Sequence, residues 1–308
     1  MIVSASRRTD IPAFYSEWFM NRLKEGYVLI PNPRNANRLG HAVLSPENVD
    51  CIVFWTKNPI PMLDKLKAID EMGYAYYIQF TLTPYDNAVE PGLPPKRELL
   101  QAFIEMSERT DNKRAVWRYD PVFIDEKYTV SRHLAAFTEM CAKLQGYTER
   151  CVLSFIDVYR NIRNTYRAMT EREMHEIAEG FAKIAKTFGV SLYTCSEEID
   201  LSSYGISHSA CIDQPLVEQI IGRRIKAKKD VNQRPACRCI ESVDVGAYDT
   251  CAHGCTYCYA VASANAMARR TASHSPEAPM ITGYPGGDEI ITDRMTPSRI
   301  VIQTGLFQ

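Results

Sequence analysis

The sequence predicts an α/β fold: one domain built as a TIM-like βα barrel, partial or closed, of about seven βα units. Two observations predict this class. Short apolar runs rich in β-branched and aromatic residues alternate with longer stretches whose apolar residues recur at helical spacing. The runs are almost continuously apolar, which is typical of parallel strands covered on both faces. No linker divides the chain, and a doubly wound open sheet is the alternative.

Strands and helices alternate along the chain. The predicted strands are residues 2–5, 51–55, 76–82, 115–118, 152–156, 190–194 and, more weakly, 242–246. The predicted helices are 14–25, 61–72, 96–108, 131–144, 170–188, 214–225 and 259–270. Gly26 can end the first helix, and Thr170 with Glu173 forms a capping box at the start of a long one. After Arg270 the sequence predicts an irregular tail that wraps the body.

The bulk composition excludes several classes of protein. Hydrophobic residues make up 45% of the chain and the formal net charge is −1, so no overall field favours nucleic acid or an anionic membrane. No apolar run approaches the roughly 20 residues that cross a bilayer, and the first residues lack the order of a signal peptide. We therefore expect a cytoplasmic protein with a small-molecule substrate and neither a membrane nor a nucleic-acid partner.

Polar residues follow the predicted strands at the point where each strand ends. In parallel βα folds these ends meet at one rim, so the pattern predicts a polar cavity there. The catalytic candidates are Arg7, Arg8, Asp10, Lys57, Arg118 and Asp120. Their basic groups suggest an anionic substrate, because Arg binds phosphate and carboxylate bidentately. The alternative is that these are ordinary solvated loops, with Arg7 or Arg8 only pairing with a neighbour such as Asp10.

Ten cysteines are many for a chain in which disulfides are not expected, and most lie near its C-terminal end. Cys251, Cys255 and Cys258 have the spacing C-x3-C-x2-C, and Gly254 allows a tight turn between them. Clustered soft thiolates select iron–sulfur or zinc. Residues 1–235 are predicted to form the barrel body, and residues 236–308 a cysteine-rich cluster-binding segment that completes the same domain.

This cysteine spacing, with Tyr257 before the last cysteine, resembles the cluster motif of the radical S-adenosylmethionine enzymes. The resemblance implies a [4Fe-4S] cluster with one open iron, S-adenosylmethionine as cofactor, a 5′-deoxyadenosyl radical and an electron donor such as flavodoxin or ferredoxin. Tyr257, Thr56 and Glu197 are predicted to contact the cofactor. In that family the loop follows the first strand, whereas here it follows the last predicted one. In a closed barrel those two strands are neighbours.

The whole chain also resembles an uncharacterised bacterial family, the domain of unknown function numbered 1848. The segments that carry this resemblance are Ser4-Ala5-Ser6-Arg7-Arg8-Thr9-Asp10, Phe54-Trp55-Thr56-Lys57-Asn58-Pro59, Trp117-Arg118-Tyr119-Asp120-Pro121 and Asp244-Val245-Gly246-Ala247-Tyr248-Asp249-Thr250-Cys251. The family implies no particular activity.

Four further cysteines precede the motif: Cys195, Cys211, Cys237 and Cys239. Four thiolates can close a second iron–sulfur cluster or a zinc site. The alternative is that Cys195 and Cys211 are small buried residues and only the other two bind metal. His253 could also serve as a ligand.

The sequence thus favours a radical S-adenosylmethionine-type enzyme that acts on a small, anionic substrate. The alternative is a non-catalytic protein whose iron–sulfur or zinc site is structural or senses redox state. A metal-dependent hydrolase ranks last, because the six histidines do not fall at the strong strand ends.

Overall fold

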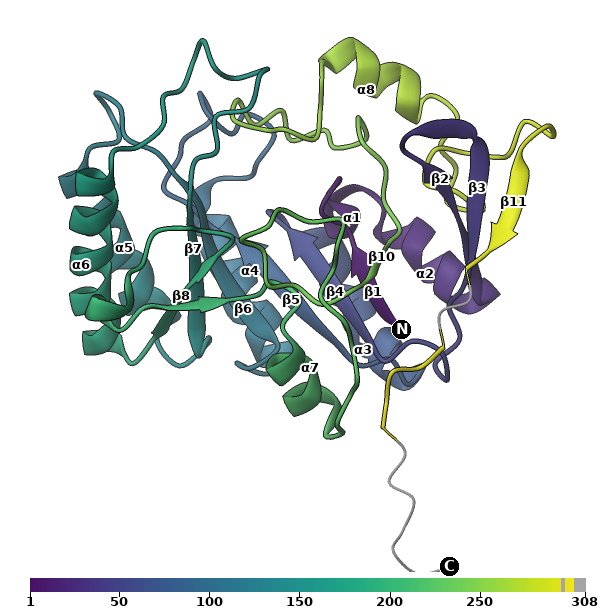
Figure 1. Cartoon of the computed structure of the whole chain (residues 1–308), viewed down its shortest axis with the longest axis horizontal. Coiled ribbons are helices and arrows are strands. Elements are labelled where there is room, and N and C mark those ends of the chain that lie inside the picture. Colours follow the sequence, from purple (N-terminus) through teal and green to yellow (C-terminus); the bar gives the residue numbers. More distant parts are fainter. Residues whose placement is uncertain (295–296, 302–308) are drawn as a thin grey trace, which may run out of the picture.

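The computed structural model describes residues 1–294 and 297–301. An eight-stranded sheet runs through it in the order β10-β1-β4-β5-β6-β7-β8-β9, and every pair of neighbours is parallel (Figure 1). The strands are β1 (Ile2–Ala5), β4 (Cys51–Thr56), β5 (Tyr76–Thr81), β6 (Ala115–Val122), β7 (Arg150–Phe155), β8 (Ser191–Cys195), β9 (Ser207–Ser209) and β10 (Val243–Asp244). The predicted α/β class is confirmed.

The sheet has two ends, formed by its shortest strands. β9 and β10 each have a single neighbour in the sheet order, so the described residues form an open sheet and not a closed barrel. The first and last of the strands predicted from the sequence are nevertheless neighbours, as they would be in a closed barrel, because Val3 and Ser4 of β1 pair with Val243 and Asp244 of β10. The chain therefore brings its late cysteine segment beside its first strand without closing the barrel.

One face of the sheet packs against helices through large aromatic side chains. These helices are α2 (Ser16–Glu25), α3 (Leu66–Glu71), α4 (Lys96–Arg109), α5 (Val130–Leu144) and α6 (Glu171–Phe188). Phe80 stacks on Phe103 at 5.2 Å between ring centroids, and Trp117 stacks on Phe137 at 5.0 Å. Burial of each such ring contributes about 1.5–3 kcal/mol. The apolar residues that recur at helical spacing in the sequence form the faces of these helices that pack against the sheet.

The opposite face is filled at its amino end by α7 (Gln214–Ile221) and by the segments around Cys211 and Cys239. Tyr77 Oη and Gln79 Nε2 both donate to the carbonyl of Cys211, at 2.6 and 2.8 Å. Side chains farther along the strands are polar, and they face the space at the carboxyl ends. The sheet therefore presents a packed base and a polar rim.

Several predicted helices differ at their ends. The 14–25 helix is two helices, α1 (Ile11–Phe14) and α2, while the 61–72 segment is a 3-10 turn, η1 (Ile60–Lys65), followed by α3. α7 ends at Ile221 because Gly222 takes a positive φ of 65°. α8 (Ala264–Thr271) begins five residues later than predicted, where Ser263 caps it. The capping box of Thr170 and Glu173 is confirmed.

A second, three-stranded sheet was not predicted. β2 (Tyr27–Asn32) and β3 (Asn35–Val43) form an antiparallel hairpin, and β11 (Ile290–Asp293) adds to β3 in parallel (Figure 1). A short 3-10 turn, η2 (Ser202–Tyr204), completes the elements. The segment after Arg270 does return to the body, since Trp18 Nε1 donates to the carbonyl of Ala278 at 2.8 Å. The described residues contain no helix with the length and apolar character of a membrane span.

Candidate functional site

A cavity of about 950 Å³ opens at the carboxyl ends of the strands. All but one of the residues predicted from the sequence to form the site line it: Arg7, Arg8, Asp10, Thr56, Lys57, Arg118, Asp120, Cys195, Cys211, Cys237, Cys239, Cys251, Cys255, Tyr257 and Cys258. The exception is Glu197, which bonds to the cavity-lining Ser154. The topology thus collects strand ends and cysteine segments that are far apart in the sequence.

The loop that carries Cys251, Cys255 and Cys258 follows β10, and all three cysteines are partly exposed to the cavity. Gly254 has a φ of 66°, a left-handed conformation that favours glycine. Gly92 lies against the loop so closely that a Cβ there would stand 2.7 Å from the carbonyl oxygen of His253. The loop is therefore fixed by backbone packing as well as by its own turn.

Hydrogen bonds from distant elements hold the same loop. Tyr15 Oη donates to the carbonyl of Thr250. The amide of Thr256 donates to the carbonyl of Val89 at 3.0 Å, and Asn161 Nδ2 donates to the carbonyl of Cys258 at 2.8 Å. These contacts satisfy loop backbone groups while leaving the thiols to the cavity.

Burial raises the pKa of the Cys255 thiol to about 12, although the nearby Lys57 lowers it. Burial and then Asp10 raise the pKa of Cys251 as well. Binding of a soft metal would displace these protons. Within residues 1–294 and 297–301, no three His, Cys, Asp or Glu side chains have the geometry to hold a metal ion as they stand.

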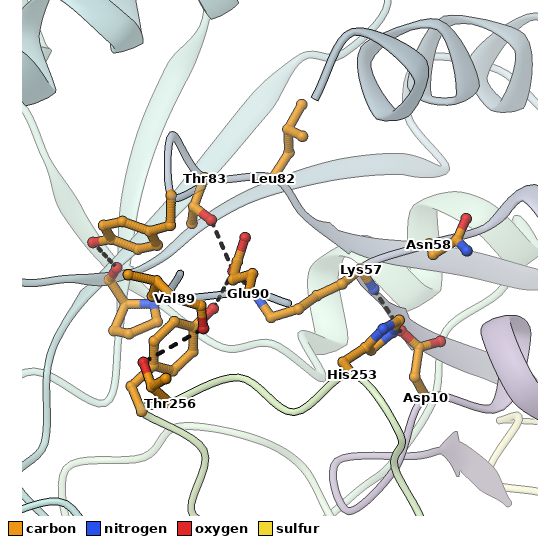
Figure 2. A network of polar contacts seen from close by, with 12 residues as sticks. Asp10, Lys57, Asn58, Leu82, Thr83, Val89, Glu90, His253 and Thr256 are labelled. Atoms are coloured by element: carbon orange, nitrogen blue, oxygen red, sulfur yellow. Dashed lines mark hydrogen bonds and ion pairs between the residues drawn. The ribbon is translucent and has the colours of Figure 1, made fainter. Parts of the chain in front are cut away.

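Glu90 is a fully buried carboxylate beside this loop, and the sequence reading missed it (Figure 2). Its Oε1 accepts from Lys57 Nζ at 3.0 Å and from Thr83 Oγ1 at 3.1 Å, and it also bonds Tyr257 Oη and Lys96. Burial opposes the charge, but Lys57 and Lys96 lower its pKa to about 2. The network fixes Tyr257, so its hydroxyl is already engaged. Glu90 lies in a Pro- and Gly-containing loop and not at a strand end, so no sequence signal marks it.

Asp10 joins three parts of the rim. Its Oδ1 accepts from the amide of Ala13 and caps α1, while its Oδ2 accepts from the amide of Lys57 at 2.7 Å. Oδ2 also lies 2.8 Å from His253 Nε2 (Figure 2). The other ring nitrogen of His253 faces the carbonyl of Gly92 at 3.4 Å. His253 is thus occupied by oxygen atoms, which disfavours it as a metal ligand.

The second cysteine group lies deeper in the cavity. The Sγ atoms of Cys195 and Cys211 are 2.7 Å apart, and Cys239 Sγ accepts from the amide of Ile212 at 3.3 Å. Contacts with Cys195, Cys211 and Cys237 lower the pKa of Cys239. All four thiols are buried. The structure therefore gathers the four upstream cysteines in one place.

Two of the predicted basic residues face these thiols. Arg118 Nη1 lies 2.6 Å from Cys211 Sγ, and its Nη2 bonds Asp120. The guanidinium groups of Arg7 and Arg118 each lie 5.3 Å from the Trp55 ring centroid. Neither Arg118 nor Lys57 is available for an anionic substrate without losing a carboxylate of the protein. The expected anion-binding role does not fit these two residues.

Arg8 fits that role better. Its guanidinium lies 5.2 Å from the Tyr248 ring centroid, and Nη1 reaches the carbonyl of Gly246 at 3.5 Å. Burial and then the charge of Arg8 lower the pKa of Arg294, which also lines the cavity. Two neighbouring guanidinium groups create a local positive potential that attracts an anion.

The remaining cofactor candidates are held by the protein itself. Thr56 Oγ1 accepts from the amide of Asn58 at 2.9 Å. Glu197 Oε1 accepts from Ser154 Oγ at 2.7 Å and from the amide of Phe155 at 3.0 Å. Burial, with Asp120 and Asp157 nearby, raises the pKa of Glu197 to about 7. Glu197 can therefore exchange a proton near neutral pH, next to the cavity.

A family model described as "Domain of unknown function (DUF1848)" matches residues 2–260. The chain belongs to this family. The match includes β1, the strand ends and both cysteine groups, so the candidate-site residues described above, except Arg294, fall within the family domain. No curated protein matches the chain.

Several solved structures show weak likeness. D-psicose 3-epimerase with D-tagatose from Clostridium cellulolyticum H10 has a TM-score of 0.35 at 12% identity, covering 72% of this chain and 81% of its own. AP endonuclease, family 2, from Brucella melitensis has a TM-score of 0.34 at 9% identity, and the likeness covers 67% of this chain and 91% of that one. A protein assigned as an alpha-L-fucosidase from Bacteroides thetaiotaomicron VPI-5482 has a TM-score of 0.28 at 11% identity, and the likeness covers 51% of this chain and 66% of that one. Likeness at this level carries no conclusion about the reaction.

Proposed function

We propose that this protein is an iron–sulfur enzyme of the radical S-adenosylmethionine type that acts on a small, anionic substrate. The observation that carries the proposal is the placement of Cys251, Cys255 and Cys258. These thiols share one loop, line a cavity of about 950 Å³ and face the polar strand ends. The loop follows an edge strand that pairs with β1, so its late position in the chain is compatible with the resemblance to that family.

The donor set fits an open cluster. Thiolates suit iron–sulfur chemistry, and His253 is directed at Asp10 and Gly92, so it does not supply a fourth ligand. When bound, a four-iron cluster with one open iron would supply the electron that cleaves S-adenosylmethionine. Lys57 lies near Cys255 and would offset the negative charge of the ligands. Arg8, beside Arg294, would orient the anionic group of the substrate.

The proposal is tested by anaerobic reconstitution with iron and sulfide, followed by reduction in the presence of S-adenosylmethionine. We expect 5′-deoxyadenosine, and a change in the electron paramagnetic resonance spectrum when the cofactor is added. Cys255→Ser should abolish both. Cys141→Ser is the matched control, because Cys141 is buried in α5 and does not line the cavity. A verified cluster that yields neither product nor spectral change would overturn the proposal.

The alternative is a non-catalytic site that is structural or senses redox state. The four-thiol group favours it in one respect, because four ligands can enclose a metal without leaving a position for substrate. A polar cavity of this size is not needed for such a role. Metal analysis of freshly purified protein separates zinc from iron.

A further inference from the structure

The four buried cysteines come from three separate segments. Cys195 ends β8, Cys211 follows β9, and Cys237 and Cys239 lie on the loop that leads to β10. Their exposed fractions are between 2% and 7%. All four are free thiols, and the Sγ atoms of Cys195 and Cys211 lie 2.7 Å apart. The fold therefore brings together four free thiols whose spacing in the sequence does not show that they are close in space.

Positive charge surrounds this group. Arg118 Nη1 lies 2.6 Å from Cys211 Sγ. Arg7 lies near Cys239 and Cys211, and its guanidinium is 5.3 Å from the centroid of the Trp55 ring, which Arg118 also faces. Guanidinium groups beside these sulfur atoms would offset the negative charge of the thiolates once a metal replaced their protons.

Among the described residues that line the cavity, four buried polar atoms lack a hydrogen-bond partner: Arg7 Nη2, Thr9 Oγ1, Ser196 Oγ and Ser242 Oγ. Ser196 follows Cys195 directly, and Ser242 lies three residues after Cys239. A buried donor without an acceptor is costly. An iron–sulfur cluster would bring inorganic sulfides that accept such hydrogen bonds in addition to the cysteine sulfurs, whereas a zinc ion enclosed by four thiolates offers the cysteine sulfurs alone. The orphaned donors favour a cluster.

Arg7 also connects the two cysteine groups. Its guanidinium lies near the Cys239 thiol, and its carbonyl accepts from Tyr259 Oη at 2.9 Å. Tyr259 follows Cys258 in the sequence. One residue at the end of β1 therefore contacts both the four-thiol group and the open-site loop, and both groups line the same cavity.

We propose that Cys195, Cys211, Cys237 and Cys239 hold a second iron–sulfur cluster that relays electrons to the open cluster of the proposed function, on which this inference rests. A one-electron carrier protein of the ferredoxin or flavodoxin class is oxidised as the four-thiolate cluster is reduced. That cluster is reoxidised as the open cluster is reduced. Each step moves one electron and forms no bond to the protein.

The decisive experiment compares three chains after anaerobic reconstitution: wild type, the Cys251→Ser/Cys255→Ser/Cys258→Ser variant and the Cys237→Ser/Cys239→Ser variant. Iron analysis and Mössbauer spectroscopy should find about eight irons in the wild type and about four in the first variant. The second variant should keep the open cluster and make 5′-deoxyadenosine with dithionite, but should lose the reaction driven by the carrier protein.

The outcomes separate this inference from the proposed function. Only about four irons in the wild type, with none in the first variant, would overturn the relay while leaving the open cluster intact. Zinc in the four-thiol group, or unchanged carrier-driven turnover in the second variant, would also overturn it. Iron retained by the first variant, with no 5′-deoxyadenosine from the wild type, would instead support the second cluster and contradict the proposed function. The wild-type iron count decides even where a variant fails to fold.

Arg118 provides an independent test. Arg118→Gln should shift the reduction potential of the four-thiolate cluster to more negative values, because the reduced cluster carries more negative charge. Arg118→Lys should restore part of the shift. Arg114→Gln is the matched control, since Arg114 also pairs with a carboxylate, that of Asp70, and lies over an aromatic ring, 4.8 Å from the Tyr76 centroid. An unchanged potential in Arg118→Gln would contradict a cluster beside this guanidinium.

Discussion

The two cysteine groups of this protein are built in opposite ways. Cys251, Cys255 and Cys258 belong to one short loop, remain partly exposed and are held by contacts to the backbone and to Tyr257. The four-thiol group draws on distant segments, is buried and has Arg118 in contact with the sulfur of Cys211. Both groups line the cavity, but the partly exposed thiols suit binding of a cofactor, and the buried thiols beside Arg118 suit storage of an electron. Because different contacts hold the two cysteine groups, a substitution can disturb one group and leave the other intact.

The largest effect is expected for Glu90→Gln. The substitution leaves the partly buried Lys57 and Lys96 without the fully buried carboxylate, and breaking a buried ion pair costs about 3 kcal/mol. Denaturant unfolding measures the loss, and iron analysis should show that the open-site loop is affected more than the four-thiol group. Glu105→Gln, at an exposed glutamate paired with Arg109, is the control. Equal iron loss at both groups would contradict their independence.

Acid should weaken the same region. The pKa of Glu90 is about 2 in the folded protein, below its ordinary 4.5. Its stabilisation is therefore fully present above pH 4.5 and is lost as the pH falls toward 2. This difference in the pKa of Glu90 corresponds to about 3 kcal/mol in the free energy of unfolding. Stability measured against pH should fall less steeply over this window in Glu90→Gln than in the wild type. Parallel curves would show that Glu90 does not carry the effect.

Gly92→Ala should displace the cysteine loop. The new Cβ would lie 2.7 Å from the oxygen and 2.8 Å from the Cα of His253, and overpacking of this kind costs about 1–3 kcal/mol. We expect reduced iron at the open site and normal iron at the four-thiol group. Gly286→Ala is the control, because its Cβ would approach no atom closer than 3.5 Å. A normal open cluster in Gly92→Ala would mean that the loop tolerates the shift.

Trp55→Phe probes the other group with a smaller effect. The change removes the hydrogen bond from Trp55 Nε1 to Ser4 Oγ, at 3.2 Å, and weakens the ring beneath Arg7 and Arg118. We expect a loss of about 1 kcal/mol in the free energy of unfolding. The spectrum of the four-thiolate cluster should change while that of the open cluster does not. The reverse pattern would assign Trp55 to the open site.

Many of the strands and helices could be predicted from the sequence, because the patterns that indicate them involve residues close together in the chain. The predicted segment 2–5 is β1 without change, and the capping box at Thr170 is present. The hairpin of β2 and β3 was missed, although Tyr27–Asn32 begins with an apolar run. Its pairing with β3 and β11 joins residues that no local period relates. Edge elements of this kind depend on what packs beside them.

The sequence by itself determined the alternation of strands and helices, the polar strand ends and the spacing of Cys251, Cys255 and Cys258, since each is a pattern among near neighbours in the chain. Only the tertiary structure decided that β10 lies beside β1, that Glu90 holds Tyr257, and that Cys195 and Cys211 meet Cys237 and Cys239. These contacts depend on strand order and on the paths of long connections. Burying a charged or polar group without a partner costs free energy, so each buried group is paired in the folded protein. The partner comes from a distant part of the chain, and no local sequence pattern identifies it.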